Sequence, residues 1–200
     1  MKKSSSIWSI RLQWLGGLLI LYVLFQFLKK KPKEGNKIIP SVGLKDGSKL
    51  DAIEIFNLIF KEESFNPTAV KDGKDRNGNQ LYTIGIGHQI QPDEVDLLEK
   101  TITLDEAKMI FEKDIKKIIE DMRNNIKVSV NKNQFLALLS LRYNIGGPQF
   151  NSSSLLKTLN EGNFTEVALK FKDWRLSEGK INSGLVARRE RERVLFTKPV

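Results

Sequence analysis

The feature that most constrains this chain is a long apolar run near its N-terminus. Residues 7–28 carry one charged side chain, Arg11, and lysines 29–31 follow the run directly. A helix over this run can cross a hydrocarbon core of about 30 Å, because Arg11 can extend its side chain to the interface. A cleaved signal peptide and a buried soluble helix are the alternatives. Since no small-residue cleavage site follows the run, we predict an uncleaved transmembrane anchor within residues 1–28.

The orientation of this anchor stays open. Basic residues flank the run on both sides, with a small excess after it, which leans toward a cytoplasmic C-terminal part. Residues 29–49 combine lysines with proline, glycine and serine, a composition typical of a flexible, solvated linker. Residues 50–200 remain for one folded domain.

Composition excludes several classes of function. The chain has no cysteine and a single histidine, so disulfides, a thiolate nucleophile and multi-histidine metal sites are excluded. We therefore expect no cofactor and no metal. A net charge of +9 suggests nucleic acid, but residues 1–50 carry +8 of it and residues 51–200 only +1. The folded part is nearly neutral, so we expect no nucleic-acid partner. We expect the basic N-terminal segment to lie at a lipid bilayer, and we expect the protein to be a monomer.

The pattern after residue 48 predicts an α+β domain that is mostly helical. A capping box at Ser48–Asp51 predicts a helix that runs to about Glu63, and residues 81–90 have the pattern of a strand in a small antiparallel sheet. A second capping box at Thr103–Glu106 opens an amphipathic helix of about 20 residues. The remaining predicted helices cover Asn133–Tyr143, which is apolar on most sides, and residues 153–160, 165–174 and 184–196.

Two carboxylates and a threonine stand out as candidates for chemistry. Glu63 ends the first predicted helix, Asp72 follows at the start of a turn, and Thr83 lies in the predicted strand. Two carboxylates in different surroundings can divide acid and base roles. From spacing alone, however, Glu63 also fits a solvated helix end and Asp72 an ordinary turn residue.

The order of motifs along the chain resembles that of a known family. The segments are Phe60–Phe65, Asp72, Tyr82–His88, Ile102–Ala107, Arg142–Phe150, Ser153–Asn160, Trp174 and Gly184–Glu192. Together they resemble the phage-type lysozymes, glycoside hydrolase family 24, over nearly all of residues 50–196. The resemblance implies a helical domain with a small antiparallel β-hairpin lobe, and peptidoglycan as substrate.

The resemblance also implies residue roles. Glu63 matches the general acid, Asp72 the catalytic aspartate, and Thr83 the threonine beside the attacking water. The family cleaves the β-1,4 bond between N-acetylmuramic acid and N-acetylglucosamine with inversion, a reaction that needs roughly 6.5–9.5 Å between the carboxyl groups for a water molecule.

Other positions are assigned less specific roles. Tyr143 and Asn144 lie on a segment expected to contact substrate, with core packing as the alternative. Arg188 corresponds to an arginine near the acid, with a solvated helix face as the alternative. His88 is expected to be structural and to pair with a carboxylate or a backbone group.

Several alternatives stay open. Ten residues separate Asp72 from Thr83, more than is usual in the family, and this insert brings Asp75, which could replace Asp72. The insert resembles a calcium loop only loosely, so a hairpin turn is the better interpretation. The motif around Glu63 also resembles that of lytic transglycosylases, and an inactive structural protein of a virion or membrane is a further possibility. The anchor would place the protein in a host inner membrane or a virion membrane, for phage entry, host lysis or bacterial wall remodelling.

Overall fold

A computed structural model of the chain describes residues 42–44, 49–75 and 77–199. The predicted anchor, residues 1–28, and most of the predicted linker lie outside these ranges. Among the described residues, no helix has both the length and the apolar character needed to cross a bilayer.

Two short strands precede helix α2 (Ala52–Glu62). Strand β1 (Val42–Gly43) pairs with β2 (Lys49–Leu50) in an antiparallel sheet. Paired backbone therefore begins within residues 29–49, the range predicted as linker.

Helix α2 (Ala52–Glu62) begins later than predicted. Its N-cap is Asp51, whose side chain accepts a hydrogen bond from the Ile53 N–H at 2.6 Å. The predicted capping box at Ser48–Asp51 is therefore wrong. The preceding Leu50 belongs to strand β2, where its side chain is buried, and extended backbone there prevents an earlier helix start.

A three-stranded antiparallel sheet follows α2. Its order is β3 (Asn66–Lys74), β4 (Gln80–Gly85) and β5 (His88–Gln89). The single strand predicted over residues 81–90 is divided in two, because Gly85 and Gly87 adopt positive φ angles of 68° and 74°. This left-handed backbone suits glycine and turns the chain between β4 and β5.

The helices predicted after Thr103 and over Asn133–Tyr143 are confirmed with small changes at their ends. The 3₁₀ helix η1 (Val95–Leu98) leads to α3 (Leu104–Asn125), which starts at the predicted capping box of Thr103 with Glu106. Helix α4 (Lys132–Ile145) is buried continuously through the middle of its length and forms the centre of the core.

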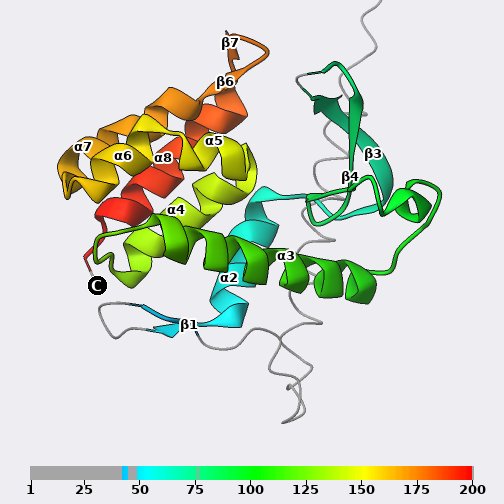
Figure 1. The fold of residues 1–200 in the computed structure, drawn as a ribbon, viewed down its shortest axis with the longest axis horizontal. Coiled ribbons are helices and arrows are strands. Elements are labelled where there is room, and N and C mark those ends of the chain that lie inside the picture. The colour runs from blue at the N-terminus through cyan, green and yellow to red at the C-terminus, as the bar shows by residue number, and fades with distance from the viewer. Residues whose placement is uncertain (1–41, 45–48, 76, 200) are drawn as a thin grey trace, which may run out of the picture. The chain divides into compact units, whose positions relative to one another are not determined.

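Further helices and one hairpin complete the described part of the fold (Figure 1). The elements are α5 (Gly147–Asn151), α6 (Ser154–Asn160), α7 (Phe164–Lys170), η2 (Phe171–Trp174), β6 (Leu176–Ser177), β7 (Lys180–Ile181) and α8 (Ser183–Thr197). The β6–β7 hairpin was not predicted. Helix α4 packs along α8, while α3 contacts the three-stranded sheet at one end and α4 and α5 at the other. The described part is thus mostly helical with a small antiparallel sheet, as predicted.

Candidate active site

Glu63 lies at the point where α2 ends and the chain enters the sheet. Its backbone is extended, and its N–H donates to the Ile59 carbonyl at 2.9 Å, which closes the last turn of the helix. Its Oε1 accepts a hydrogen bond from Arg188 Nη1 at 2.7 Å, and 21% of the side chain is exposed. The carboxyl group is therefore held by a cation on one side and open to a bound molecule on the other.

Arg188 reaches Glu63 from the C-terminal helix α8. Its side chain is only 6% exposed. Besides Glu63, the guanidinium donates from Nη2 to the Ser140 carbonyl at 3.2 Å and from Nε to Glu192 Oε1 at 3.3 Å. The solvated helix face considered as an alternative for Arg188 is therefore wrong. Since all three nitrogens have protein partners, this geometry suits holding Glu63 better than contacting a sugar.

Tyr143 links α4 to the turn between β4 and β5. Its hydroxyl donates to the Ile86 carbonyl at 2.5 Å. A Cβ atom added at Gly87 would lie 3.3 Å from the Tyr143 ring and 3.4 Å from Glu63 Oε2, so only a glycine fits this turn without crowding. Burial, and then the negative charges of Asp114 and Glu63, raise the pKa of Tyr143, so it is a neutral hydrogen-bond donor. Tyr143 therefore packs against the β4–β5 turn, and its contact with a sugar stays a prediction.

Asp72 lies on strand β3 beside a β-bulge, not at the start of a turn as predicted. Lys71 pairs with Tyr82 and Lys74 with Gln80, so Asp72 and Gly73 together lie opposite one residue of β4. A bulge of this kind re-aims side chains and is common beside active sites. The Asp72 side chain is exposed, and within the described part of the chain it has no hydrogen-bond or ion-pair partner.

Thr83 occupies the middle strand of the same sheet. It pairs with Val70 of β3 and with Gln89 of β5, and 9% of the residue is exposed. Val70 and Thr83 are direct cross-strand partners, so their side chains share one face. The β3–β4 hairpin therefore carries both Asp72 and Thr83, directly after the helix that ends at Glu63.

Asp75 organises the tip of this hairpin. Its Oδ1 accepts from the N–H groups of Asn77 and Asn79 at 2.8 Å each, and its Oδ2 accepts from the Asn79 side chain at 2.8 Å. These bonds, above all those from Asn79, lower the pKa of Asp75. The carboxylate thus has a structural partner for each oxygen, as a turn residue requires.

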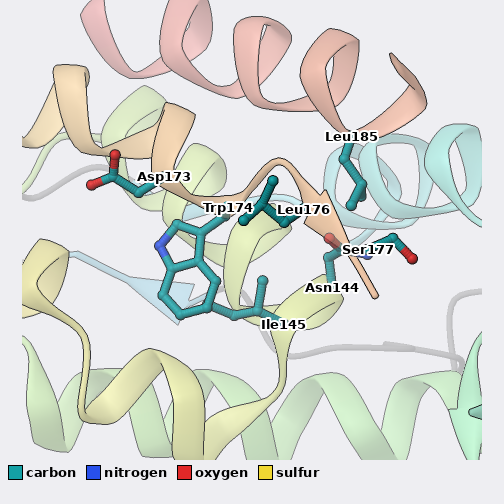
Figure 2. A pocket seen from close by; sticks show the side chains of 7 residues that line it. All are labelled: Asn144, Ile145, Asp173, Trp174, Leu176, Ser177 and Leu185. Atoms are coloured by element: carbon teal, nitrogen blue, oxygen red, sulfur yellow. The ribbon is translucent and has the colours of Figure 1, made fainter. Parts of the chain in front are cut away.

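Asn144 lines a surface pocket of about 340 Å³. The pocket is formed by the end of α4, by η2 with the following strand β6, and by the start of α8 (Figure 2). Its other lining residues are Ile145, Asp173, Trp174, Leu176, Ser177 and Leu185. The Asn144 Oδ1 accepts from Arg189 Nη2 at 3.1 Å, which fixes the amide and leaves its NH₂ group available to a ligand.

His88 has the structural role that the sequence predicts. Its Nδ1 lies 2.7 Å from Asp114 Oδ2 on α3, and its Nε2 lies 2.8 Å from Glu94 Oε2. Burial acts to lower the pKa of His88, but the bonds and charges of Asp114 and then Glu94 outweigh it and raise that pKa. A protonated ring can donate to both carboxylates, so His88 clamps the sheet onto α3.

Within residues 42–44, 49–75 and 77–199, no group of three or more acidic or histidine side chains is placed to hold a metal ion. Sequence reasoning missed the roles of Gly87, Ser140 and Glu192. The two closely spaced glycines of the predicted strand, Gly85 and Gly87, could have indicated the role of Gly87. The roles of Ser140 and Glu192 are recognisable only once α4 and α8 are packed together.

The fold is lysozyme-like. The muramidase domain of SpmX from Asticaccaulis excentricus is a similar solved structure, with a TM-score of 0.61 and 28% sequence identity, covering 76% of this chain and 99% of that one. The sequence model described as phage lysozyme matches residues 61–192, well over half of the chain. The chain therefore belongs to the phage lysozyme family.

Individual relatives agree with this assignment. The endolysin of Bacillus phage PZA is 39% identical over 137 residues, which are 67% of this chain and 51% of that protein. The SAR-endolysin of Enterobacteria phage P21 is 35% identical over 97 residues, 48% of this chain and 59% of the other. The chain spans about half the length of the Bacillus phage endolysins that it matches.

The clamp around His88 predicts a measurable titration. His88 is the single histidine of the chain, so an NMR titration of its imidazole needs no further assignment. We expect a midpoint above the ordinary histidine value of about 6.5. Because the folded-state pKa is raised, the clamp stabilises the native state fully below pH ~6.5, and this stabilisation is lost as the pH rises through the raised pKa.

The variant His88→Gln provides the comparison. The difference in free energy of unfolding between the wild type and this variant should be largest near pH ~6 and should shrink at higher pH. A midpoint at or below the ordinary value, or a difference independent of pH, would contradict the ion-pair clamp.

Proposed function

We propose that this protein is a lysozyme-type glycosidase that hydrolyses peptidoglycan. The observation that carries the proposal is the Glu63 carboxyl group at the end of α2, fixed by the buried Arg188 at 2.7 Å and still partly exposed. Membership of the phage lysozyme family supports the same chemistry. The bond cleaved would be the β-1,4 linkage between N-acetylmuramic acid and N-acetylglucosamine.

In this mechanism Glu63 is the general acid. It donates its proton to the glycosidic oxygen as the bond from that oxygen to the anomeric carbon breaks. Asp72 accepts a proton from a water molecule whose oxygen bonds to the anomeric carbon from the opposite side, which inverts the configuration. Thr83 positions this water through its hydroxyl group, and the leaving sugar departs with the proton from Glu63.

The hairpin geometry favours Asp72 over Asp75 as the base. Asp72 is exposed and its carboxylate has no partner among the described residues, so it can bind a water molecule. The Asp75 oxygens already accept three hydrogen bonds within the turn. Recruiting Asp75 would require the turn to lose these bonds.

For substrate contact we propose the pocket that Asn144 lines. Its amide can bond to the carbonyl of an N-acetyl group, and the Trp174 indole offers an apolar surface to a sugar ring. Arg188 and Tyr143 would then act by holding Glu63 and the β4–β5 turn, a role supported by their hydrogen bonds to these groups.

We also propose that residues 1–28 anchor the protein in a membrane, through residues 7–28, and that residues 29–49 tether a monomeric domain formed by residues 50–200. The support is the apolar run itself and the similarity to SAR-endolysins. The enzyme would act on the cell wall from a host inner membrane or a virion membrane.

Removing the proton donor tests the mechanism. Glu63→Gln should lower the rate of peptidoglycan solubilisation by about 100-fold or more, because positioned acids contribute on this scale. The matched control is Glu54→Gln on the same helix, whose carboxylate pairs with Lys132 at the surface, and it should keep the wild-type rate. Full activity of Glu63→Gln would reject the mechanism. A wild type that releases 1,6-anhydro sugars would instead be a lytic transglycosylase.

The two aspartates of the hairpin can be separated by equivalent changes. Asp72→Asn should lower activity by about 100-fold, since it removes the base. Asp75→Asn should retain most of the activity, because the turn lies at an exposed tip. The opposite pattern in the same assay would assign the base to Asp75.

The anchor can be tested in the full chain. Leu21→Arg with Val23→Arg should release the protein from the membrane fraction, because each central arginine costs roughly 2.5–3.5 kcal/mol in a bilayer. Leu21→Val with Val23→Leu keeps the run apolar and should leave the protein in that fraction. Equal distribution of both double variants after high-salt washing would count against an anchor.

A further inference from the structure

Glu192 is a buried carboxylate that the mechanism above does not use. It lies on α8, one helical turn after Arg188, and its side chain is 3% exposed. Its Oε1 accepts from Ser140 Oγ at 2.7 Å, from Arg189 Nη2 at 2.9 Å and from Arg188 Nε at 3.3 Å. Burying a charge at this depth is unfavourable unless it is paired, so the partners of Glu192 are informative.

Arg188 connects Glu192 to Glu63. The guanidinium bonds to Glu192 through Nε and to Glu63 through Nη1, at opposite parts of one rigid, planar group. Fixing the Nε end therefore fixes the direction of the Nη1 end. Ser140 contributes to both sides, since its hydroxyl holds Glu192 and its carbonyl accepts from Arg188 Nη2.

The positive charge of Arg188 bears on the proposed role of Glu63. A general acid must hold a proton before the reaction, and Glu63 lies 2.7 Å from the positively charged guanidinium of Arg188. A second cation, Arg189, lies beside Arg188 on the same helix. Among the described residues, Glu63 and Glu192 are the carboxylates that form ion pairs with Arg188, so without Glu192 this pairing would fall to Glu63 alone.

We propose that Glu192 is a positioning residue for the acid, which aims Arg188 at Glu63 and offsets its charge so that Glu63 can carry the proton. This inference rests on the proposed role of Glu63 as general acid. Burial raises the pKa of Glu192, although Arg189, Ser140 and Arg188 act to lower it. The ionised state of Glu192 thus depends on the same network that holds Arg188.

The other titratable groups near this cluster come from three helices. Glu62 on α2 pairs with the half-exposed Arg191 on α8 at 2.6 Å, and it also faces Arg188 and Arg189. Tyr143 on α4 lies close enough to Glu63 and Arg188 for both charges to act on the pKa of its hydroxyl group. These groups stay unchanged in the experiment below, so a shift between variants reports on Glu192.

The test is the pH dependence of peptidoglycan hydrolysis by the full chain. Activity should fall at high pH as Glu63 loses its proton, which gives kcat/KM a basic limb. In Glu192→Gln this limb should move to lower pH by about one pH unit, the lower end of the effect of one neighbouring charge. The control is Glu190→Gln on the same helix, an exposed residue paired with Arg193, and its limb should stay in place.

A second variant covers the case in which Glu192→Gln does not fold. Ser140→Ala removes only the hydroxyl that stabilises the Glu192 carboxylate, and it should move the limb in the same direction by less. The proposal is overturned if the basic limb of kcat/KM in each folded variant lies at the same pH as in the wild type. A merely structural role for Glu192 predicts this result, even where stability or rate falls. Failure of the proposed function is distinct, because Glu63→Gln would then remain active.

Discussion

The ion pair between Glu63 and Arg188 is the interaction on which the rest of the site depends. It joins residues 125 positions apart, the end of the first described helix and the middle of the last. Both groups are largely removed from water, and such a pair is stable only where further hydrogen bonds satisfy the remaining donors. Ser140 and Glu192 provide these bonds for Arg188. The Glu63 carboxyl group is therefore positioned by the packing of α4 and α8, and not by its own helix alone.

A second set of contacts fixes the sheet to the same carboxyl group. Tyr143 holds the β4–β5 turn from α4, and the absence of a side chain at Gly87 lets that turn lie against Glu63. His88 then holds β5 to α3 through Asp114. Three helices thus define where the sheet lies relative to Glu63. The position of this sheet in turn sets the positions of Asp72 and Thr83.

Local patterns in the sequence predicted much of this arrangement. The capping box at Thr103, the apolar character of the helix through Leu138 and the pairing of His88 with a carboxylate are all confirmed. Each depends on residues close in the chain or on a strong preference of one residue type. The helix start at Ser48 was wrong because a two-residue strand pair, which no local pattern reveals, contains Leu50.

Long-range features could not be predicted in the same way. Arg188 fitted a solvated face as well as an active site, because its burial depends on α2 and α4, which are far away in sequence. The strand at residues 66–74 is mostly exposed, so it lacks the apolar alternation that marks a half-buried strand. Its bulge at Asp72 and Gly73 appears only when the register with β4 is known.

The β3–β4 hairpin joins the strand of Asp72 to the strand of Thr83 through a long connection. The residues between Asp72 and Thr83 continue both strands and close in a turn that Asp75 and Asn79 hold together. Because additional residues at a hairpin tip extend into solvent, they leave the pairing of Val70 with Thr83 unchanged. Asp72 lies between that pair and the tip, and its bulge absorbs the difference in length between the two strands. The residues at the tip therefore form the turn and supply a second aspartate, Asp75, while Asp72 and Thr83 lie on the paired strands.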